Sequence, residues 1–289
     1  MIVRNAITVD VEDYFHVSAF SSRISREDWD SYECRVEQNT QRLLDLFDGL
    51  GAKGTFFVLG WVAERYPGLV KEIASRGHEV ACHGFSHRLV YEQSPKEFRD
   101  ETVRAKSVLE DLVQVSVRGY RAASYSIVDR SLWALDVLVE EGFTYDSSIF
   151  PIRHDRYGMP DARREPHRLR TPSGYSIVEF PMSTVELGKY RLPVSGGGYF
   201  RLFPYWVTKA ALRKINNDEG APFIFYLHPW EIDPRQPRIE SSWLSRFRHY
   251  NNLEKCEHRL QRLLNDFCFT GAESVLHDVG VLQREAPVR

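Results

Sequence analysis

Apolar and polar positions along the first half of the chain follow two alternating periods, which predicts strands and helices in turn. The run from Ile7 to Asp10 reads as an apolar strand that ends in acidic residues. Apolar side chains then recur at helical spacing from Val36 to Leu50, and Gly51 stands where a helix would stop. The same pattern predicts further strands at 54–59, 80–83, 117–121 and 143–146 and further helices at 61–74, 94–112 and 129–141. This rhythm favours an α/β fold with parallel strands and right-handed crossovers, either a barrel or an open doubly wound sheet.

The second half is less regular. Residues 152–176 are rich in Arg, Pro and Gly without periodicity, so we expect an excursion loop over the strand ends. The run Ser195-Gly-Gly-Gly198 permits close backbone approach or a flexible lid, although a plain connector fits it equally well. The pattern also predicts strands at 176–180, 222–228 and 274–277 and helices at 204–216 and 253–267. We therefore expect a single domain over residues 1–289, with a C-terminal extension at 229–289.

Composition narrows the class of protein. With 289 residues and 43% hydrophobic content, the chain has enough apolar material for one main domain. Its formal net charge of -2 gives no basic field, so we expect no binding of nucleic acid through bulk charge. The N-terminal segment lacks a signal-peptide core, and no apolar run approaches the ~20 residues that cross a bilayer. These features predict a cytoplasmic protein without a membrane span.

Candidate chemistry begins with two histidines that directly follow an apolar run. His83 and His87 stand four residues apart, so a strand that bends into a turn would bring both imidazoles to one point, as metal ligands require. This spacing alone is a weak signal. An acidic cluster of Asp10, Glu12 and Asp13 at the end of the first strand strengthens it. Carboxylates at the carboxyl end of a strand lie where α/β folds hold their active sites.

These residue types suit metal-assisted hydrolysis of an amide or ester. A catalytic zinc takes about three protein N and O ligands and keeps one position open, so two imidazoles and a carboxylate are sufficient. A second carboxylate is needed to accept a proton, and an acid is needed to protonate the leaving amine. His228, at the end of an apolar run, is the candidate acid, and a hydrogen bond from Asp146 would raise its pKa. Arg121 is placed to pair with the base and keep it ionised.

Five sequence blocks, taken together and in this order, resemble the polysaccharide deacetylase family, the NodB-homology carbohydrate esterases. They are Thr8–Asp13, His83–His87, Arg121–Tyr125, Asp146–Ser148 and Leu227–His228. Two further stretches, Pro193–Arg201 and His228–Asp233, look like the subgroup found in bacterial exopolysaccharide loci.

The resemblance implies a distorted (β/α) barrel of about seven parallel strands. It also implies a divalent metal, with zinc expected, and removal of acetyl from an N-acetylated saccharide in polysaccharide biosynthesis. The implied roles are Asp10 as base, His83 and His87 as metal ligands, Arg121 as the arginine that orients the base, His228 as acid and Asp146 as the partner of that acid. A backbone amide near Ser124 or Tyr125 would bind the oxyanion.

The chain departs from the family pattern in three places. The acids are spaced Asp-x-Glu-Asp, so the metal carboxylate is either Glu12, which strand alternation favours, or Asp13, which a bend after Val11 would favour. Ala123 replaces an expected proline, which loosens the predicted oxyanion turn. A tryptophan expected after the Asp146 block is absent, with Ile149 and Phe150 in its place, so the predicted acetyl pocket has a different shape.

Two other functions remain open from the sequence. Similar barrels hydrolyse cyclic amides, sometimes without a metal. A barrel without activity could instead bind glycan through exposed tryptophans, for which the candidates are Trp61, Trp206, Trp230 and Trp243. The sequence leaves open which sugar is used, whether it is polymeric, lipid-linked or nucleotide-linked, and the oligomeric state.

Overall fold

The computed structural model describes residues 3–154, 156–188 and 190–283. Its strands are β1 (Arg4–Val11), β2 (Thr55–Val58), β3 (Glu79–Cys82), β4 (Gly119–Tyr120), β5 (Tyr145–Asp146), β6 (His167–Arg170), β7 (Ser176–Glu179), β8 (Thr184–Leu187), β9 (Tyr190–Pro193), β10 (Ile224–Leu227) and β11 (Cys268–Thr270). Its α-helices are α1 (Val36–Gly49), α2 (Gly60–Arg65), α3 (Pro67–Ser75), α4 (Pro95–Val113), α5 (Trp133–Glu140), α6 (Gly197–Leu202), α7 (Tyr205–Asn217), α8 (Trp243–Tyr250), α9 (Leu253–Asp266) and α10 (Ala272–Asp278). Among these described helices, none combines the length and apolarity of a membrane span.

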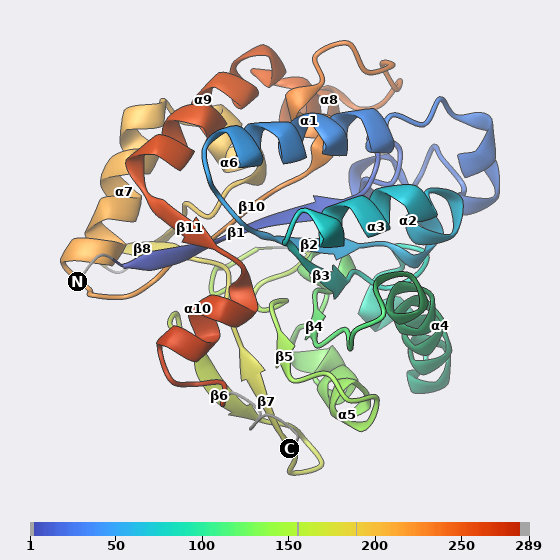
Figure 1. The fold of residues 1–289 in the computed structure, drawn as a ribbon, viewed down its shortest axis with the longest axis horizontal. Helices are drawn as coiled ribbons and strands as arrows, with labels where there is room; N and C mark the ends of the chain where they lie inside the picture. Colours follow the sequence, from blue (N-terminus) through green and yellow to red (C-terminus); the bar gives the residue numbers. More distant parts are fainter. Residues whose placement is uncertain (1–2, 155, 189, 284–289) are drawn as a thin grey trace.

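A curved, mainly parallel sheet organises the fold. In the described part of the chain, seven strands run parallel in the spatial order β10-β1-β2-β3-β4-β5-β7. Strand β6 joins the β7 edge antiparallel, and the short β11 pairs with the start of β1. Helices α1, α3, α4 and α5 surround the sheet (Figure 1). The described strand path has two ends, at β10 and β6, so hydrogen bonds do not close it into a ring. The predicted distorted barrel of about seven parallel strands is confirmed.

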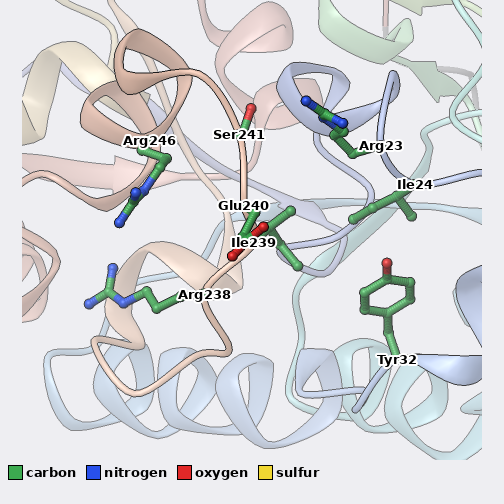
Figure 2. Close-up of a pocket in the computed structure, with 8 residues that line it drawn as sticks. All are labelled: Arg23, Ile24, Tyr32, Arg238, Ile239, Glu240, Ser241 and Arg246. Atoms are coloured by element: carbon green, nitrogen blue, oxygen red, sulfur yellow. The ribbon is translucent and has the colours of Figure 1, made fainter.

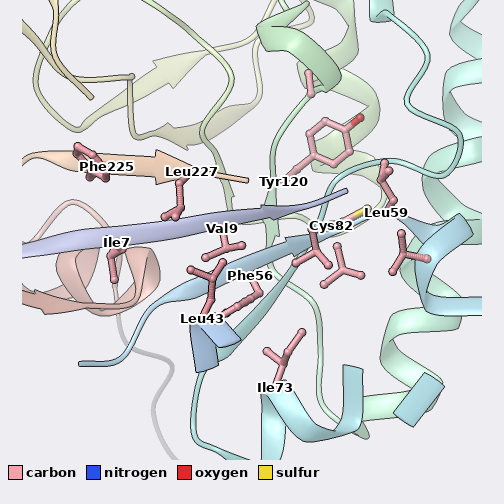
Figure 3. Close-up of a cluster of buried hydrophobic side chains, with 14 of the residues drawn as sticks. Ile7, Val9, Leu43, Phe56, Leu59, Ile73, Cys82, Tyr120, Phe225 and Leu227 are labelled. Atoms are coloured by element: carbon pink, nitrogen blue, oxygen red, sulfur yellow. The ribbon is translucent and has the colours of Figure 1, made fainter. Parts of the chain in front are cut away.

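Alternation along β1 places apolar and polar side chains on opposite faces of the sheet. Ile7 and Val9 point outward into the main hydrophobic cluster, where they meet Leu43 of α1 and Phe56 of β2 (Figure 3). Successive side chains of a strand face opposite ways, so Asp10 points into the barrel. The outer layer therefore anchors β1 through apolar burial, and the inner face carries a carboxylate to the strand's carboxyl end.

A helix, not a strand, fills the amino-terminal end of the barrel. We predicted a strand at 274–277 from four residues, but the structure forms helix α10 there. Its buried residues Ala272, Val275 and Leu276 follow helical i, i+3, i+4 spacing and pack inside the barrel against Ala6 and Phe57. Four residues are too few to separate the two periods, so the strand prediction was wrong.

Two further predictions need correction. The helix expected at 61–74 is two helices, α2 and α3, because Pro67 disfavours helical backbone at the preceding Tyr66, whose ψ is 58°. The segment 152–176, expected to be irregular, contains strand β6. The outward-facing arginines of β6 masked its alternation in the sequence.

The glycine run at 195–198 places a loop directly against β10. Gly196 has φ 125°, and a Cβ there would lie 1.9 Å from the carbonyl oxygen of Tyr226. Of the alternatives that the sequence leaves open for this run, the structure forms the close backbone approach. Helix α6 starts at the next residue and is thereby held beside β10.

We expect Gly196→Ala to destabilise the protein, because an L side chain at this φ is strained and its Cβ would clash with backbone. The expected loss in free energy of unfolding is about 1–3 kcal/mol, measured by chemical denaturation. Gly198→Ala is the matched control, since its Cβ would meet no atom nearer than 3.9 Å. Equal stability of the two variants would contradict this account of the loop.

Candidate active site

The carboxyl ends of the parallel strands collect the polar residues singled out from the sequence. Each of these residues lies at or just beyond the end of its strand: Asp10 and Glu12 with β1, His83 with β3, Arg121 with β4, Asp146 with β5 and His228 with β10. All six are buried or nearly so. Parallel alignment thus brings residues distant in sequence to one mouth of the barrel.

Three ligand atoms converge there. One from each of Glu12, His83 and His87 lie within 4.8 Å of one another, and all three residues are buried. His87 Nε2 is 2.9 Å from Glu12 Oε2. His83 Nδ1 lies 2.8 Å from the Arg121 carbonyl oxygen, which can only accept, so Nδ1 carries the proton and Nε2 keeps its lone pair. Two imidazoles and one carboxylate are a donor set that fits a divalent metal such as zinc.

The turn after β3 explains how both histidines reach this point. Gly84 has φ 72°, and His87 itself has φ 51°, a left-handed conformation that costs a non-glycine residue energy. Arg26 Nε donates to the Ser86 carbonyl oxygen at 2.8 Å, and Ser86 Oγ donates to Glu101 at 2.6 Å. These contacts hold the turn in the conformation that aims His87 back at Glu12.

Asp13 does not lie in this group. Its Oδ2 accepts the N–H groups of Arg35 at 2.5 Å and Val36 at 2.7 Å, at the start of α1. Its Oδ1 accepts the N–H of Tyr14 at 2.9 Å. A carboxylate is favourable at a helix N-terminus, where N–H groups lack partners within the helix. Of the two carboxylates that the sequence left open as metal ligand, the structure therefore brings only Glu12 to the histidines.

Asp10 is held by Arg121, as the sequence suggested. Arg121 is fully buried, and its Nη1 donates to Asp10 Oδ1 at 2.6 Å and to Thr8 Oγ1 at 2.8 Å. Its remaining donors reach the Ser147 hydroxyl and carbonyl oxygens at 3.0 and 3.1 Å. The guanidinium also lies 4.1 Å from the Phe57 ring centroid. A paired, hydrogen-bonded arginine fixes the direction of the Asp10 carboxylate.

His228 has a different partner from the one expected. Its Nδ1 lies 2.8 Å from Glu231 Oε1, and the other oxygen of Glu231 accepts from Arg201 Nε at 2.5 Å. The expected contact with Asp146 does not form, because Pro229 starts a 3-10 turn, η6 (Pro229–Ile232), that folds Glu231 back over His228. His228 Nε2 faces Glu12 Oε1 at 3.3 Å and Asp10 Oδ2 at 4.0 Å.

The sequence reading missed Glu231 and Arg201. His228 and Glu231 have the three-residue spacing of a capping box, with Pro229 at the first position of the turn between them. This spacing was the signal in the sequence that could have indicated Glu231. Arg201 lies in α6, and its other donors reach the carbonyl oxygens of residues 248, 249 and 251 at 2.8–3.1 Å. No local pattern would have indicated these contacts.

Charges at the mouth are strongly coupled. Burial would raise the pKa of Glu12, but His87, His228 and His83 outweigh it and hold that pKa well below its usual range. Burial would lower the pKa of His228, but the carboxylates of Glu12, Glu231 and Asp10 raise it to about 9. Glu12 is therefore ionised near neutral pH, as a metal ligand must be. His228 is a protonated imidazolium near neutral pH, as a proton donor must be.

Asp146 belongs to a separate buried pair. Burial raises its pKa to about 6, while the pKa of its neighbour Glu179 is raised well above the usual range by burial and by the charge of Asp146. Ser148 Oγ donates to Asp146 Oδ1 at 2.6 Å, and the Ile149 N–H donates to Glu179 Oε1 at 3.0 Å. Burial and the charge of Asp146 thus favour the protonated form of Glu179, and the hydrogen bonds of the pair fix the loop after β5.

The expected oxyanion turn carries backbone strain. Ser124 and Tyr125 both have positive φ, 49° and 55°, in the 3-10 turn η4 (Ala123–Tyr125). The Tyr125 N–H donates to the Ala122 carbonyl oxygen at 3.1 Å and is thus engaged. The Ser124 N–H has no acceptor among the described residues, which leaves it as the candidate oxyanion donor.

The four tryptophans take different places. Trp230 is buried and stacks on His228, with ring centroids 5.0 Å apart, so it packs behind this side chain. Trp61 is half-buried against the hydrophobic clusters. Trp206 and Trp243 are exposed on α7 and α8. The four therefore do not form one glycan-binding surface.

A cavity of about 260 Å³ is lined by His87, one of the three converging residues. His87 and His16 line it on the side of the barrel mouth, and Phe15, Ile24 and Trp29 are among the apolar residues of its wall. A cavity next to the catalytic groups is the natural place for a ligand.

Comparison with known proteins divides the chain in two. Residues 28–144 match the family model described as polysaccharide deacetylase. Residues 147–277 match a model described as a domain of unknown function, DUF3473. The first segment contains both histidines of the β3 turn and Arg121, and the second contains Arg201, His228 and Glu231.

Individual relatives match either part of the chain or its whole fold. A peptidoglycan-N-acetylglucosamine deacetylase of Bacillus cereus is 31% identical over 98 residues, which is 34% of this chain and 36% of that relative. The match thus spans about a third of the length of that curated relative. The solved structure of a Mycobacterium smegmatis protein provisionally classed as a polysaccharide deacetylase has a TM-score of 0.63 at 21% identity, over 99% of this chain and 94% of that one. Puue allantoinase has a TM-score of 0.59 at 14% identity, over 98% of this chain and 92% of that one. Both structural likenesses show the fold alone.

We expect the two acidic neighbours at the end of β1 to separate in their effects. Glu12→Gln should weaken zinc binding by more than the roughly 10–100-fold that loss of an outer-shell partner costs, because it removes a charged ligand. Asp13→Ala should keep zinc binding but lower the free energy of unfolding by about 1–3 kcal/mol, because the backbone N–H groups it accepts lose their partner. Calorimetric zinc titration and denaturation measure the two effects. The opposite pattern would show that Asp13 is the ligand.

Proposed function

Since this chain belongs to the polysaccharide deacetylase family through residues 28–144, we propose that it hydrolyses the N-acetyl amide of an N-acetylated saccharide. The observation that carries the proposal is the convergence of Glu12, His83 and His87 next to a paired carboxylate, Asp10, and a charged imidazole, His228. Amide hydrolysis needs an electrophile activator, a base and an acid in one place, and these residues can supply each.

Glu12, His83 and His87 would hold a divalent metal, for which zinc is the candidate because the donor set is two nitrogens and one oxygen. A bound ion supplies Lewis acidity that polarises the amide carbonyl and makes water more acidic. The Arg121 carbonyl oxygen orients His83 by accepting from its Nδ1. The protein's part is therefore to fix the direction of each donor before substrate arrives.

Proton transfers fall to Asp10 and His228. Asp10 accepts the proton of the attacking water, and its hydrogen bond from Arg121 orients its carboxylate for this step. His228 enters as the imidazolium and donates from Nε2 to the leaving nitrogen, which departs as an amine. The Ser124 N–H lies in the turn where an oxyanion donor is expected. Glu231 and Arg201 act as positioning residues, because they hold the ring of His228 through Nδ1.

The second half of the chain contributes to the same reaction. Arg201 lies in the stretch 193–201 and Glu231 in the stretch 228–233, the two stretches that resemble the exopolysaccharide subgroup. Glu231 contacts His228 and Arg201 pairs with Glu231, which supports the view that residues 147–277 complete the catalytic unit. We accordingly propose a role in exopolysaccharide biosynthesis, with the described chain acting as one catalytic domain.

Acetate release from an N-acetylated chitooligosaccharide tests the function. We expect release by the zinc-loaded protein and a loss of about 100- to 10,000-fold in kcat for Asp10→Asn and for His228→Gln, the range that general acid–base groups contribute. Asp161→Asn is a surface control. A cyclic ureide serves as the second substrate, and hydrolysis of the ureide without acetate release from the saccharide would favour the cyclic-amide alternative.

Glu231→Gln and Asp146→Asn distinguish the two candidate partners of His228. We expect Glu231→Gln to lower kcat by about tenfold or more with little change in KM, because 1.4 kcal/mol of lost acid positioning is a factor of ten. Asp146→Asn should have the smaller effect on kcat, since Asp146 contacts Ser148 and not His228. A larger kcat loss in Asp146→Asn would restore the partner expected from the sequence.

A further inference from the structure

A second cavity, of about 590 Å³, lies beyond the one next to His87. Two separate segments line it: Arg23, Ile24 and Tyr32 from the region after β1, and Arg238–Ser241 with Arg246 from the loop and helix that follow η6. Figure 2 shows the two segments facing each other across the cavity. Nothing in the proposed reaction uses these residues.

The arginines of this cavity lack acidic partners. Many arginines of the protein form ion pairs, such as Arg104 with Glu64 and Arg42 with Glu257. In contrast, Arg23, Arg238 and Arg246 have no carboxylate within 4.0 Å among the described residues. Together with Glu240, the only acidic residue among those lining the described cavity, they give it a formal net charge of +2.

The Tyr250 ring positions the guanidinium of Arg238. This guanidinium lies over the ring, 4.3 Å from its centroid, and the Tyr250 hydroxyl accepts the Ile239 N–H at 2.7 Å. Figure 2 shows Arg238 and Arg246 on the same side of the cavity, with their side chains extending toward each other.

The arginine cavity adjoins the cavity next to His87. Ile24 lines both of them. Tyr32 of the arginine cavity stacks on Phe15 of the cavity next to His87, with ring centroids 5.4 Å apart. Arg201 also ties the acid to this region, because it bonds both Glu231 and the backbone at the end of α8, the helix that carries Arg246. The two cavities are therefore neighbours, as two subsites of one extended ligand would be.

We propose that the arginine cavity is a subsite for a diphosphate ester, so that the substrate is an N-acetylated oligosaccharide diphosphate with the acetylated sugar in the cavity next to His87. Guanidinium groups bind phosphate oxygens through paired N–H donors, and the +2 charge of the lining matches the two negative charges of a diphosphate diester. This inference rests on the proposed function and names its substrate class. The diphosphate is carried either by a lipid or by a nucleotide.

Binding of ligands that share a saccharide and differ in the group attached to it tests the inference independently of catalysis. Three derivatives of triacetylchitotriose are compared. They are the methyl glycoside, the uridine diphosphate ester and a short-chain isoprenyl diphosphate ester in detergent. For the wild-type protein we expect at least one diphosphate ester to bind about tenfold or more tightly than the methyl glycoside, a difference of 1.4 kcal/mol. The ester that binds more tightly identifies the source of the diphosphate.

Variants assign the preference to the cavity. In Arg238→Gln/Arg246→Gln the preference should fall to about twofold or less, whereas Arg262→Gln should keep it. Arg262 is the matched control, since it also stacks on a tyrosine, Tyr205 at 4.5 Å, but lies on α9 outside the cavity. Equal affinity of wild-type protein for all three ligands, or an undiminished preference in the double variant, would overturn the subsite. Failure of the proposed function would be seen separately, as absence of acetate release from every ligand.

Discussion

A single buried cation, the guanidinium of Arg121, fixes the geometry of the catalytic mouth. Burying an unpaired charge is costly, so this side chain must keep all its partners. Its donors reach Asp10 and Thr8 on β1 and Ser147 after β5, and its own carbonyl oxygen accepts from His83 after β3. One residue at the end of β4 therefore connects the base, one imidazole of the metal group and the loop beyond β5.

The acid is supported from outside the barrel by a parallel arrangement. Arg201, 2% exposed, pairs with Glu231, and Glu231 contacts His228. The loop at Gly196 brings α6, and hence Arg201, close enough to β10 for this contact. Each buried charge is thus balanced by an opposite one next to it, which makes the catalytic groups rigid without leaving a charge uncompensated. The strain at His87 and Ser124 is tolerated within this frame.

Local signals in the sequence predicted much of the fold. The helix expected at 94–112 forms as α4, which starts at a capping box of Ser94 and Glu97. The five ordered blocks resemble the family whose model matches residues 28–144. Strand alternation favoured Glu12 over Asp13, and the structure agrees in bringing Glu12 to the histidines. These features depend on residues a few positions apart, which is the range over which periodicity and capping operate.

Contacts between distant segments were not predictable in the same way. Asp146 was expected as the partner of His228, as the family resemblance implies, but a 3-10 turn that starts at Pro229 places Glu231 there. Arg201 reaches Glu231 across 30 residues, and α10 is a helix because of what it packs against inside the barrel. In each case tertiary packing decides between local alternatives that the sequence leaves nearly equal.

X-ray absorption at the zinc edge of the zinc-loaded protein tests the central claim most directly. Convergence of Glu12, His83 and His87 on one ion predicts a first shell of nitrogen and oxygen alone, at about 2.0–2.2 Å, with the scattering of two imidazoles. In Glu12→Gln that spectrum should be lost or changed. Sulfur in the first shell, or a shell without imidazole, would contradict the account.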